Sequence, residues 1–126
     1  MKMRKILILA GVYNIAGGLT IIFLLDFVAP LLDFHDQGNM LFRLFAGGTA
    51  VAFGLGYLSA CRNYEKNRPI VYYGTGIKYW AFLVSLYCYV AHHLSAQVLL
   101  GFGGINFVFA LLFTRFFLLR PARSSG

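Results

Sequence analysis

Four polar side chains that could bind a ligand lie inside the apolar stretches of this chain: Asn14, Tyr57, Lys78 and Asn106. Asn14, Lys78 and Asn106 each lie eight residues from the basic end of their apolar stretch, a depth of about 12 Å in a helix that rises 1.5 Å per residue. An amide oxygen of Asn14 or Asn106 can accept a hydrogen bond from the Lys78 ammonium, and so can the Tyr57 hydroxyl. The spacing predicts one polar layer to which several helices contribute.

Lys78 is the most informative member of this layer. A charged side chain at the bilayer centre costs about 2.5–3.5 kcal/mol on insertion scales, so it is usually paired, neutralised or functional. No Asp or Glu lies in any of the apolar stretches, and the layer therefore suits an anionic or carbonyl-bearing ligand better than a cation. Two interpretations stay open: a structural lysine whose stem extends toward the membrane surface, and a lysine that binds or moves a ligand.

A second polar group lies in and beside the connections on the other side: Asp33, His35, Asp36, Arg43, His92 and His93. Asp36, Arg43 and His92 are candidate binding residues at this outer mouth, and we expect Arg43 to form an ion pair with Asp36 or Asp33. Adjacent helical residues diverge by about 100°, so His92 and His93 do not easily bind one metal ion. We therefore expect no metal site, with a His/Asp site built from both connections as the alternative.

Signatures of catalysis are missing from the sequence. It contains no H-E-x-x-H, G-x-S-x-G, phosphate-binding loop or C-x-x-C motif, the short patterns that mark common hydrolytic, nucleotide-binding and disulfide chemistry. Cys61 and Cys88 fall at opposite ends of the apolar stretches, too far apart to form a disulfide with each other. The sequence favours a protein that is not an enzyme and needs no cofactor.

The elements that must position these residues follow from the composition. Of 126 residues, 60% are hydrophobic and 12% are charged, and the mean hydropathy is +0.72, whereas soluble domains are about 25% charged. A soluble globular fold and a disordered chain are both excluded. Four stretches are long and apolar enough to cross a bilayer as helices: residues 6–25, 40–60, 70–91 and 98–114. We predict a single all-α domain over residues 1–126, a polytopic four-helix transmembrane bundle with up-down-up-down topology.

The basic residues predict how this bundle is oriented. Nine of the 11 Lys and Arg residues precede the first stretch, separate the second from the third, or follow the fourth. Cytoplasmic segments retain Lys and Arg, so we expect a membrane protein with both termini in the cytoplasm and the lipid bilayer as its partner. The net charge of +7 then sets topology, and no nucleic-acid partner is expected because no clustered soluble basic face is present.

The longest link, residues 26–39, is half apolar. Its apolar residues include Phe27, Val28, Leu31 and Leu32, and Pro30 suits the first turn of a helix. The link is either a short amphipathic helix in the membrane interface or a loop packed over the outer mouth of the bundle.

Small and polar residues recur at four- and three-residue steps on two of the predicted helices. One stripe consists of Gly74, Lys78, Ala81, Ser85, Cys88 and His92. The other consists of Arg43, Gly47, Ala50, Gly54, Tyr57 and Cys61. In lipid such residues mark the faces where helices meet, so both stripes are predicted to face the inside of the bundle. Glycines on other faces favour self-association into a homo-oligomer.

Several short motifs occur together along the chain: Tyr13-Asn14, Phe42-Arg43, Gly54-Leu55-Gly56-Tyr57, Pro69-Ile70-Val71, Gly74-Thr75-Gly76-Ile77-Lys78 and Asn106. In combination they resemble a family of small, largely uncharacterised four-helix bacterial inner-membrane proteins that is distantly DoxX-like. In that family an acidic residue often follows the asparagine of the last helix, where this chain has Phe107. The resemblance implies the four-helix fold, a place in the bacterial inner membrane with both termini in the cytoplasm and, because DoxX-type proteins are associated with quinone-linked redox assemblies, a redox-associated role as the alternative function.

Two functional hypotheses follow. The first is a membrane protein that binds or transports a small apolar or anionic ligand at Asn14, Tyr57, Lys78 and Asn106. The second is a non-catalytic or redox-associated subunit of a larger membrane complex with haem or quinone as its cofactor. For haem, His92 is the one histidine on an inward stripe.

Overall fold

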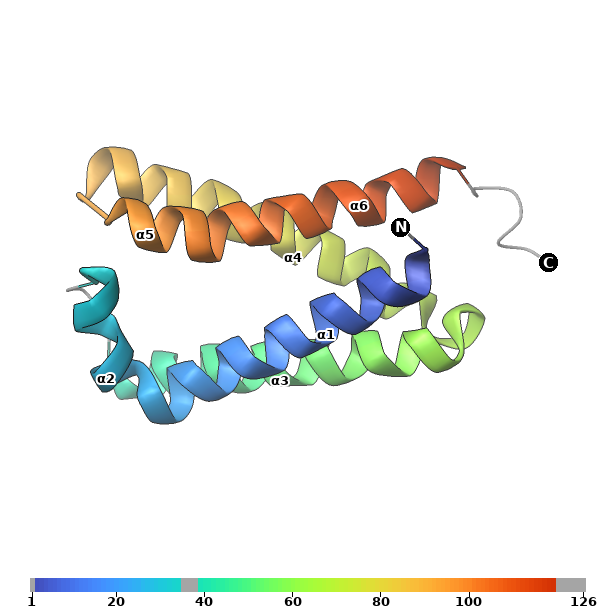
Figure 1. Ribbon diagram of the computed structural model, residues 1–126, viewed down its shortest axis with the longest axis horizontal. Coiled ribbons are helices and arrows are strands. Elements are labelled where there is room, and N and C mark those ends of the chain that lie inside the picture. Colours follow the sequence, from blue (N-terminus) through green and yellow to red (C-terminus); the bar gives the residue numbers. More distant parts are fainter. Residues whose placement is uncertain (1, 35–38, 120–126) are drawn as a thin grey trace.

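The computed structural model describes residues 2–34 and 39–119, which form four long helical segments and no strand (Figure 1). The first segment comprises α1 (Met3–Leu19), the π-helix η1 (Thr20–Leu24), α2 (Leu25–Val28) and the 3-10 helix η2 (Ala29–Leu32). The second and third segments are α3 (Met40–Arg62) and α4 (Tyr64–Ala91). The fourth comprises α5 (Ala96–Val98), the π-helix η3 (Leu99–Gly104) and α6 (Ile105–Leu119).

Side-chain caps determine where three of these segments begin. Asn39 accepts a hydrogen bond from the backbone N–H of Phe42 at 3.0 Å, and Asn63 accepts one from Lys66 at 3.2 Å. Ser95 caps the fourth segment, as expected for residues whose side-chain oxygens satisfy the free N–H groups of a first turn. Because Asn63 caps α4, this helix begins at Tyr64 rather than at the predicted residue 70.

Three of the four segments are long and apolar enough to cross a membrane: Met3–Leu32, Met40–Arg62 and Ala96–Leu118. The remaining segment, α4, is the longest single α-helix at 28 residues. It carries six of the eight tyrosines of the chain as well as Lys78, which lower its hydropathy relative to the others. The chain is therefore compatible with an integral membrane protein, with three clearly apolar segments instead of the predicted four.

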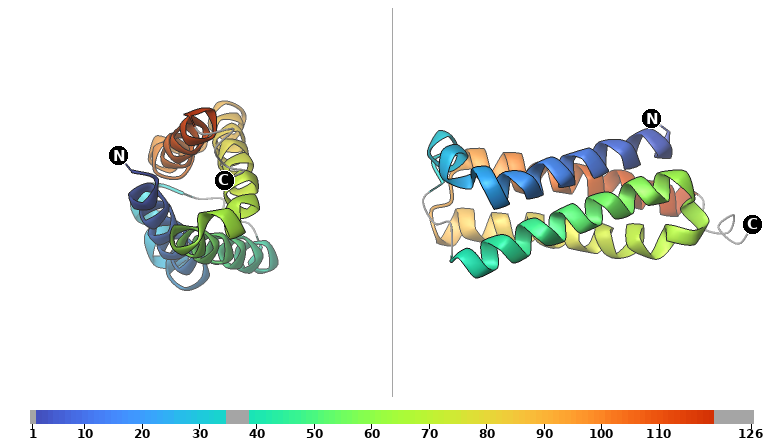
Figure 2. Two further views of the ribbon diagram at one scale, coloured as in Figure 1. Left: turned by 90° about the vertical axis from the view of Figure 1, so that its right-hand side faces the viewer. Right: turned by 90° about the horizontal axis from the view of Figure 1, so that it is seen from below.

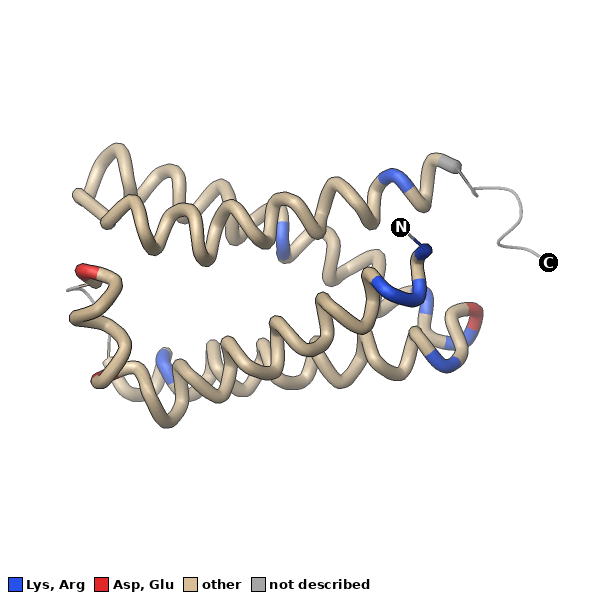
Figure 3. Tube along the Cα trace, in the orientation of Figure 1, with Lys and Arg blue, Asp and Glu red and all other residues tan. Residues whose placement is uncertain are grey.

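Successive segments run antiparallel and form a ring in the order α1, α3, α4 and α6 (Figure 2). As a result, α1 begins at the end of the bundle where α6 finishes and where α3 meets α4. We call this the basic end (Figure 3), because its described cations are Lys2, Arg4, Lys5, Arg62, Lys66, Arg68 and Arg115. The opposite end, called the far end, contains α2, η2 and α5.

The ring is built from two helix pairs that pack by different means. In the α1–α3 pair the backbones approach closely, because a Cβ on Gly18 would meet the Gly47 carbonyl oxygen and one on Gly11 would lie 3.0 Å from that of Gly54. Small residues permit such contacts in membrane helices. The pair of α4 with η3 and α6 instead packs through rings: Phe82 and Phe107 stack with centroids 4.4 Å apart.

The apolar core lies toward the basic end. Its buried members come from all four segments: Ile6, Leu7, Ala10, Tyr57, Ala60, Val71 and Phe113. At the far end, the link predicted for residues 26–39 is helical as far as Leu32, so α2 and η2 continue the first segment after a bend at η1. Pro30 lies in the first turn of η2. Residues 35–38 of this link lie outside the described residues.

Candidate functional site

Lys78 occupies the middle of α4 and is 2% exposed. At 1.5 Å per residue it lies about 21 Å along the helix from Tyr64 and about 20 Å from Ala91. The predicted depth of about 12 Å was counted from residue 70, and α4 extends six residues further toward the basic end. A lysine at this position lies within the bundle, and its amine meets partners inside it.

Two asparagines from opposite helix pairs bind the amine of Lys78. Nζ donates to Oδ1 of Asn14 on α1 at 2.8 Å and to Oδ1 of Asn106 on α6 at 2.9 Å. Each amide is itself oriented by its NH2 group. That of Asn14 donates to the Ala50 carbonyl oxygen at 3.3 Å, and that of Asn106 donates to the Phe102 carbonyl oxygen at 2.7 Å. Both amide oxygens are therefore held facing Lys78, and the three residues of the predicted layer meet.

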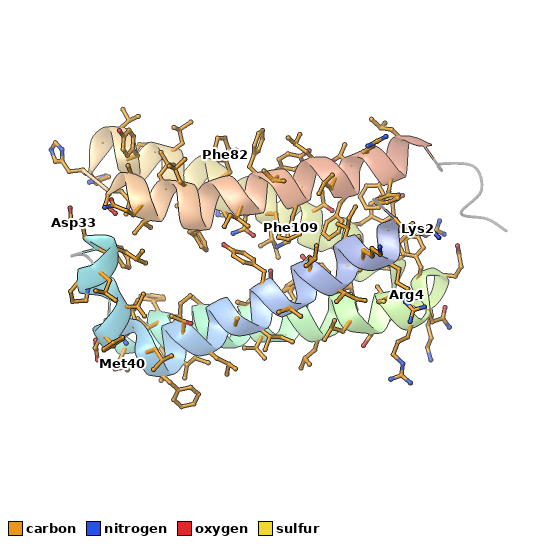
Figure 4. The ribbon with its side chains drawn as sticks, in the orientation of Figure 1. Lys2, Arg4, Asp33, Met40, Phe82 and Phe109 are labelled. Carbon is orange, nitrogen blue, oxygen red and sulfur yellow. The ribbon has the colours of Figure 1, made fainter. Side chains whose placement is uncertain are left out.

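Three aromatic rings surround the rest of the amine. The ring centroids of Tyr57, Phe109 and Tyr13 lie 5.2, 5.3 and 5.7 Å from Nζ, within the range of cation–π attraction. In Figure 4, Phe109 lies between the two helix pairs. The Tyr57 hydroxyl, predicted as a hydrogen-bond acceptor for Lys78, packs instead against Gly74 of α4, so Tyr57 contributes its ring face.

Tyr13 and Phe109 are the site residues that the sequence reasoning missed. Tyr13 precedes Asn14 and Phe109 is three residues beyond Asn106, so in both cases the ring lies next to a polar residue that was selected. The Tyr13 hydroxyl also donates to the Gly101 carbonyl oxygen of η3 at 2.7 Å. Isolated π-helical turns are frequent at functional sites, and here one supplies carbonyls to both Tyr13 and Asn106.

No acidic side chain shares the layer of Lys78 among the described residues. Asp26 belongs to α2, Asp33 follows η2 and Glu65 lies in the first turn of α4, so all three are near the ends of the bundle. The ammonium is surrounded by neutral amide oxygens and ring faces. Its positive charge is stabilised there without being neutralised.

At the far end, Arg43 of α3 pairs with Asp26 of α2, with Nη1 and Oδ1 3.3 Å apart. The sequence pointed to Asp33 or Asp36 as the partner; Asp36 lies outside the described residues. Asp26 comes beside Arg43 because the first segment stays helical past residue 25. The Arg43 side chain is 11% exposed while that of Asp26 is 80% exposed, and the buried Nε of Arg43 has no hydrogen-bond partner among the described residues.

The two inward stripes are buried or partly buried with one exception. His92, predicted to face inward, is exposed, because α4 ends at Ala91 and His92 takes the C-cap position with non-helical dihedral angles. Its ring meets the edge of Tyr87 with centroids 5.5 Å apart. The described residues contain no group of three or more His, Cys, Asp or Glu side chains placed to hold a metal ion.

Comparison with protein-family models, with curated proteins and with solved structures gives no match. The resemblance to a DoxX-like family therefore stays a prediction from the motifs. Two of those motifs have a clear place in this structure, because Gly74 accommodates the Tyr57 ring and Asn106 binds Lys78.

The Lys78 ammonium has one N–H donor that the two asparagines do not use. An ammonium has three N–H donors, and the two asparagines use two of them. A carboxylate or carbonyl oxygen that met the third would form a charge-assisted hydrogen bond, the stronger class of such bonds. The aromatic rings would then lie against the body of that molecule.

Proposed function

We propose that this protein resides in the bacterial inner membrane, with its basic end in the cytoplasm, and binds or transports a small ligand through an anionic or carbonyl oxygen at Lys78. One observation carries the proposal: a buried ammonium in the middle of the bundle has two neutral acceptors, a spare donor and, among the described residues, no acidic partner. An anionic ligand would supply the missing negative charge, whereas a cation would be repelled.

A lysine with a purely structural role is not favoured at this buried position. Burying an ion carries a desolvation penalty of several kcal/mol, and well-packed apolar residues of similar volume are often as stabilising or more so. The two amides are also preorganised, since each NH2 group is bound to a backbone carbonyl before the oxygen meets Lys78. Preorganised polar groups of this kind are what a binding site requires.

The direct test is the nuclear magnetic resonance signal of the Lys78 side chain. The chain has four lysines, and the other three, Lys2, Lys5 and Lys66, are exposed at the basic end. Protein labelled with nitrogen-15 at Nζ is placed in phosphatidylcholine nanodiscs and titrated with butyrate, palmitate or decylubiquinone. We expect at least one of the three probes to shift the Lys78 signal saturably.

Two controls make this result specific. Lys78→Met assigns the signal by removing it, and Lys66 reports any general effect of a negative probe on an exposed lysine. If none of the three probes shifts the Lys78 signal, or if Lys66 shifts in parallel at every concentration, the proposed function is wrong.

A quinone-associated subunit is the second candidate. A quinone carbonyl can accept from Lys78, and a flat ring can stack on Phe109 or Tyr13, which lie beside the amine. Haem is less favoured, because the described histidines, His92 and His93, lie at the far end of α4 and are exposed. Organic extraction of the purified protein followed by absorbance separates the two hypotheses: quinone recovered at one molecule per chain supports the redox role, and its absence together with palmitate binding supports the ligand carrier.

A further inference from the structure

Among the described residues, side chains or helices lie across the bundle axis at both ends, between Lys78 and the outside. At the basic end the fully buried side chains of Ile6, Leu7 and Phe113 fill the interior. At the far end α2 and η2 rise from the first segment toward α5 (Figure 1), and Ser95 Oγ donates to the Leu32 carbonyl oxygen at 2.7 Å. That bond ties η2 to the start of the fourth segment and places both over the far end.

Three of the four seams around the ring are closed by tight contacts. The α1–α3 seam is closed by glycine backbones and the α4–α6 seam by stacked aromatic rings. The α3–α4 seam is closed where Tyr57 packs against Gly74. The seam between α1 and α6 with η3 is the least extensive of the four among the described residues. An opening between helices is therefore easiest at this seam.

Two glycines line this fourth seam in its far half. Gly101 of η3 accepts the Tyr13 hydroxyl of α1, and Gly17 follows Tyr13 one helical turn toward the far end. A Cβ built on either glycine meets no atom within 4 Å. We call the strip formed by Tyr13, Gly17 and Gly101 the α1–η3 seam.

Tyr13 is placed to act as the gate of this seam. Its hydroxyl spans the seam to Gly101, and its ring lies 5.7 Å from the Lys78 amine. Rotation of this one side chain would break the hydrogen bond to Gly101 and remove one of the three rings around the amine. The neighbours of the two bonded residues, Val12 and Phe102, are 55% and 44% exposed, so the approach to the gate is apolar.

From these contacts we infer that the ligand is a membrane-dissolved amphiphile with a carboxylate head, which enters sideways through the α1–η3 seam when Tyr13 swings away. The inference rests on the proposed function, since it names the ligand class and route for the same Lys78 site. The carboxylate meets the third N–H of Lys78 while the apolar tail remains in the seam or in the surrounding lipid. No covalent step is involved.

The first test compares a tailed and an untailed carboxylate in the same nanodiscs. Palmitate should shift the Lys78 nitrogen-15 signal, whereas butyrate, which shares the head but partitions into water, should not. A shift with butyrate and none with palmitate would overturn the sideways route and leave binding at Lys78 intact. No shift with either carboxylate or with decylubiquinone would instead overturn the proposed function itself.

The second test measures exchange of palmitate labelled with carbon-13 at its carboxyl group. Tyr13→Phe keeps the ring and removes the bond to Gly101, and the loss of one neutral hydrogen bond corresponds to about a three- to fivefold shift toward the open state. Exchange between free and bound palmitate should accelerate by that factor. The matched control is Tyr79→Phe, which removes the 2.7 Å bond to Thr114 on another seam and should leave exchange unchanged. Equal exchange rates in the two variants would overturn the gate.

The third test fills the seam. Gly101→Leu introduces a side chain where the structure has room for a Cβ, so it should fold and slow palmitate exchange. Gly76→Leu on α4 also has open space around its Cβ and serves as the control with normal exchange. Slowing by both substitutions, or by neither, would contradict entry through the α1–η3 seam.

Discussion

The bond between Lys78 and Asn106 links α4 to α6 in the middle of the bundle, and a double-mutant cycle can isolate its contribution. Asn106→Leu removes the acceptor of the 2.9 Å bond from Lys78 and the donor of the 2.7 Å bond to the Phe102 carbonyl. The same substitution in a Lys78→Met background removes only the second of these bonds. The difference between the two costs is the coupling energy.

The magnitudes follow from the type of each bond. A hydrogen bond to a charged group contributes about 1.5–3 kcal/mol, and a neutral one inside a membrane bundle averages about 0.6 kcal/mol. Asn106→Leu should therefore lower the unfolding free energy by about 2–4 kcal/mol in the wild type and by about 0.6 kcal/mol next to Met. Lys78→Met alone should lower it by no more than about 3 kcal/mol, because the loss of two bonds, about 3–6 kcal/mol together, is offset in large part by relief of the roughly 2.5–3.5 kcal/mol cost of burying the charge.

The assay is reversible unfolding in mixed micelles with increasing dodecyl sulfate, followed by circular dichroism. Asn67→Leu is the matched control, because the Asn67 amide donates to the carbonyls of Ser59 and Asn63 near the basic end and should cost the same in both backgrounds. If the coupling between Asn106 and Lys78 is below about 0.5 kcal/mol, the level at which distant sites are additive, the hydrogen-bonded layer does not exist in solution.

Three further predictions concern the rest of the bundle. Gly18→Ala should destabilise the protein by about 1–3 kcal/mol, as overpacking does, because its Cβ would meet the Gly47 carbonyl. Gly48→Ala, with open space around its Cβ, should be neutral. Equal melting temperatures for the two variants would refute the packing of α1 against α3. Asp26→Asn should lower the unfolding free energy by less than about 1 kcal/mol, because the Asp26 side chain is 80% exposed and exposed ion pairs contribute little. A larger loss in urea or detergent unfolding would contradict this. Green fluorescent protein fused after the last residue should fluoresce in bacteria, and alkaline phosphatase fused there should be inactive, because the basic end is expected in the cytoplasm. The opposite pattern would show that the orientation is reversed.

The hydrogen-bonded layer could be predicted because helix geometry is regular. Equal spacing of Asn14, Lys78 and Asn106 from one end of their stretches places them at a common depth whatever the packing details, and the structure brings them within hydrogen-bond distance. The aromatic shell could not be predicted in the same way. With 13 Phe and eight Tyr in 126 residues, spacing alone does not indicate which rings turn inward, and the packing of the helices is needed to place Tyr13 and Phe109 beside Lys78.

The differences at the helix ends have local causes. α4 starts before residue 70 because Asn63 provides a side-chain cap in a region that its charges had marked as a link. Arg43 pairs with Asp26 because the first segment continues as helix through Asp26, which the sequence had placed in the link between the first two apolar stretches. The π-helical turns η1 and η3 leave no recognisable pattern in sequence, so the carbonyl that holds Tyr13 could not have been foreseen.

The account depends above all on a carboxylate meeting the spare N–H of Lys78. Dipolar recoupling in solid-state nuclear magnetic resonance measures the distance between Nζ labelled with nitrogen-15 and the carboxyl carbon of bound palmitate labelled with carbon-13. A charge-assisted hydrogen bond spans about 2.7–2.9 Å from nitrogen to oxygen, so the nitrogen–carbon distance should be below about 4 Å in the wild type, and the signal should vanish in Lys78→Met. Bound palmitate without measurable coupling to Lys78 would contradict the account.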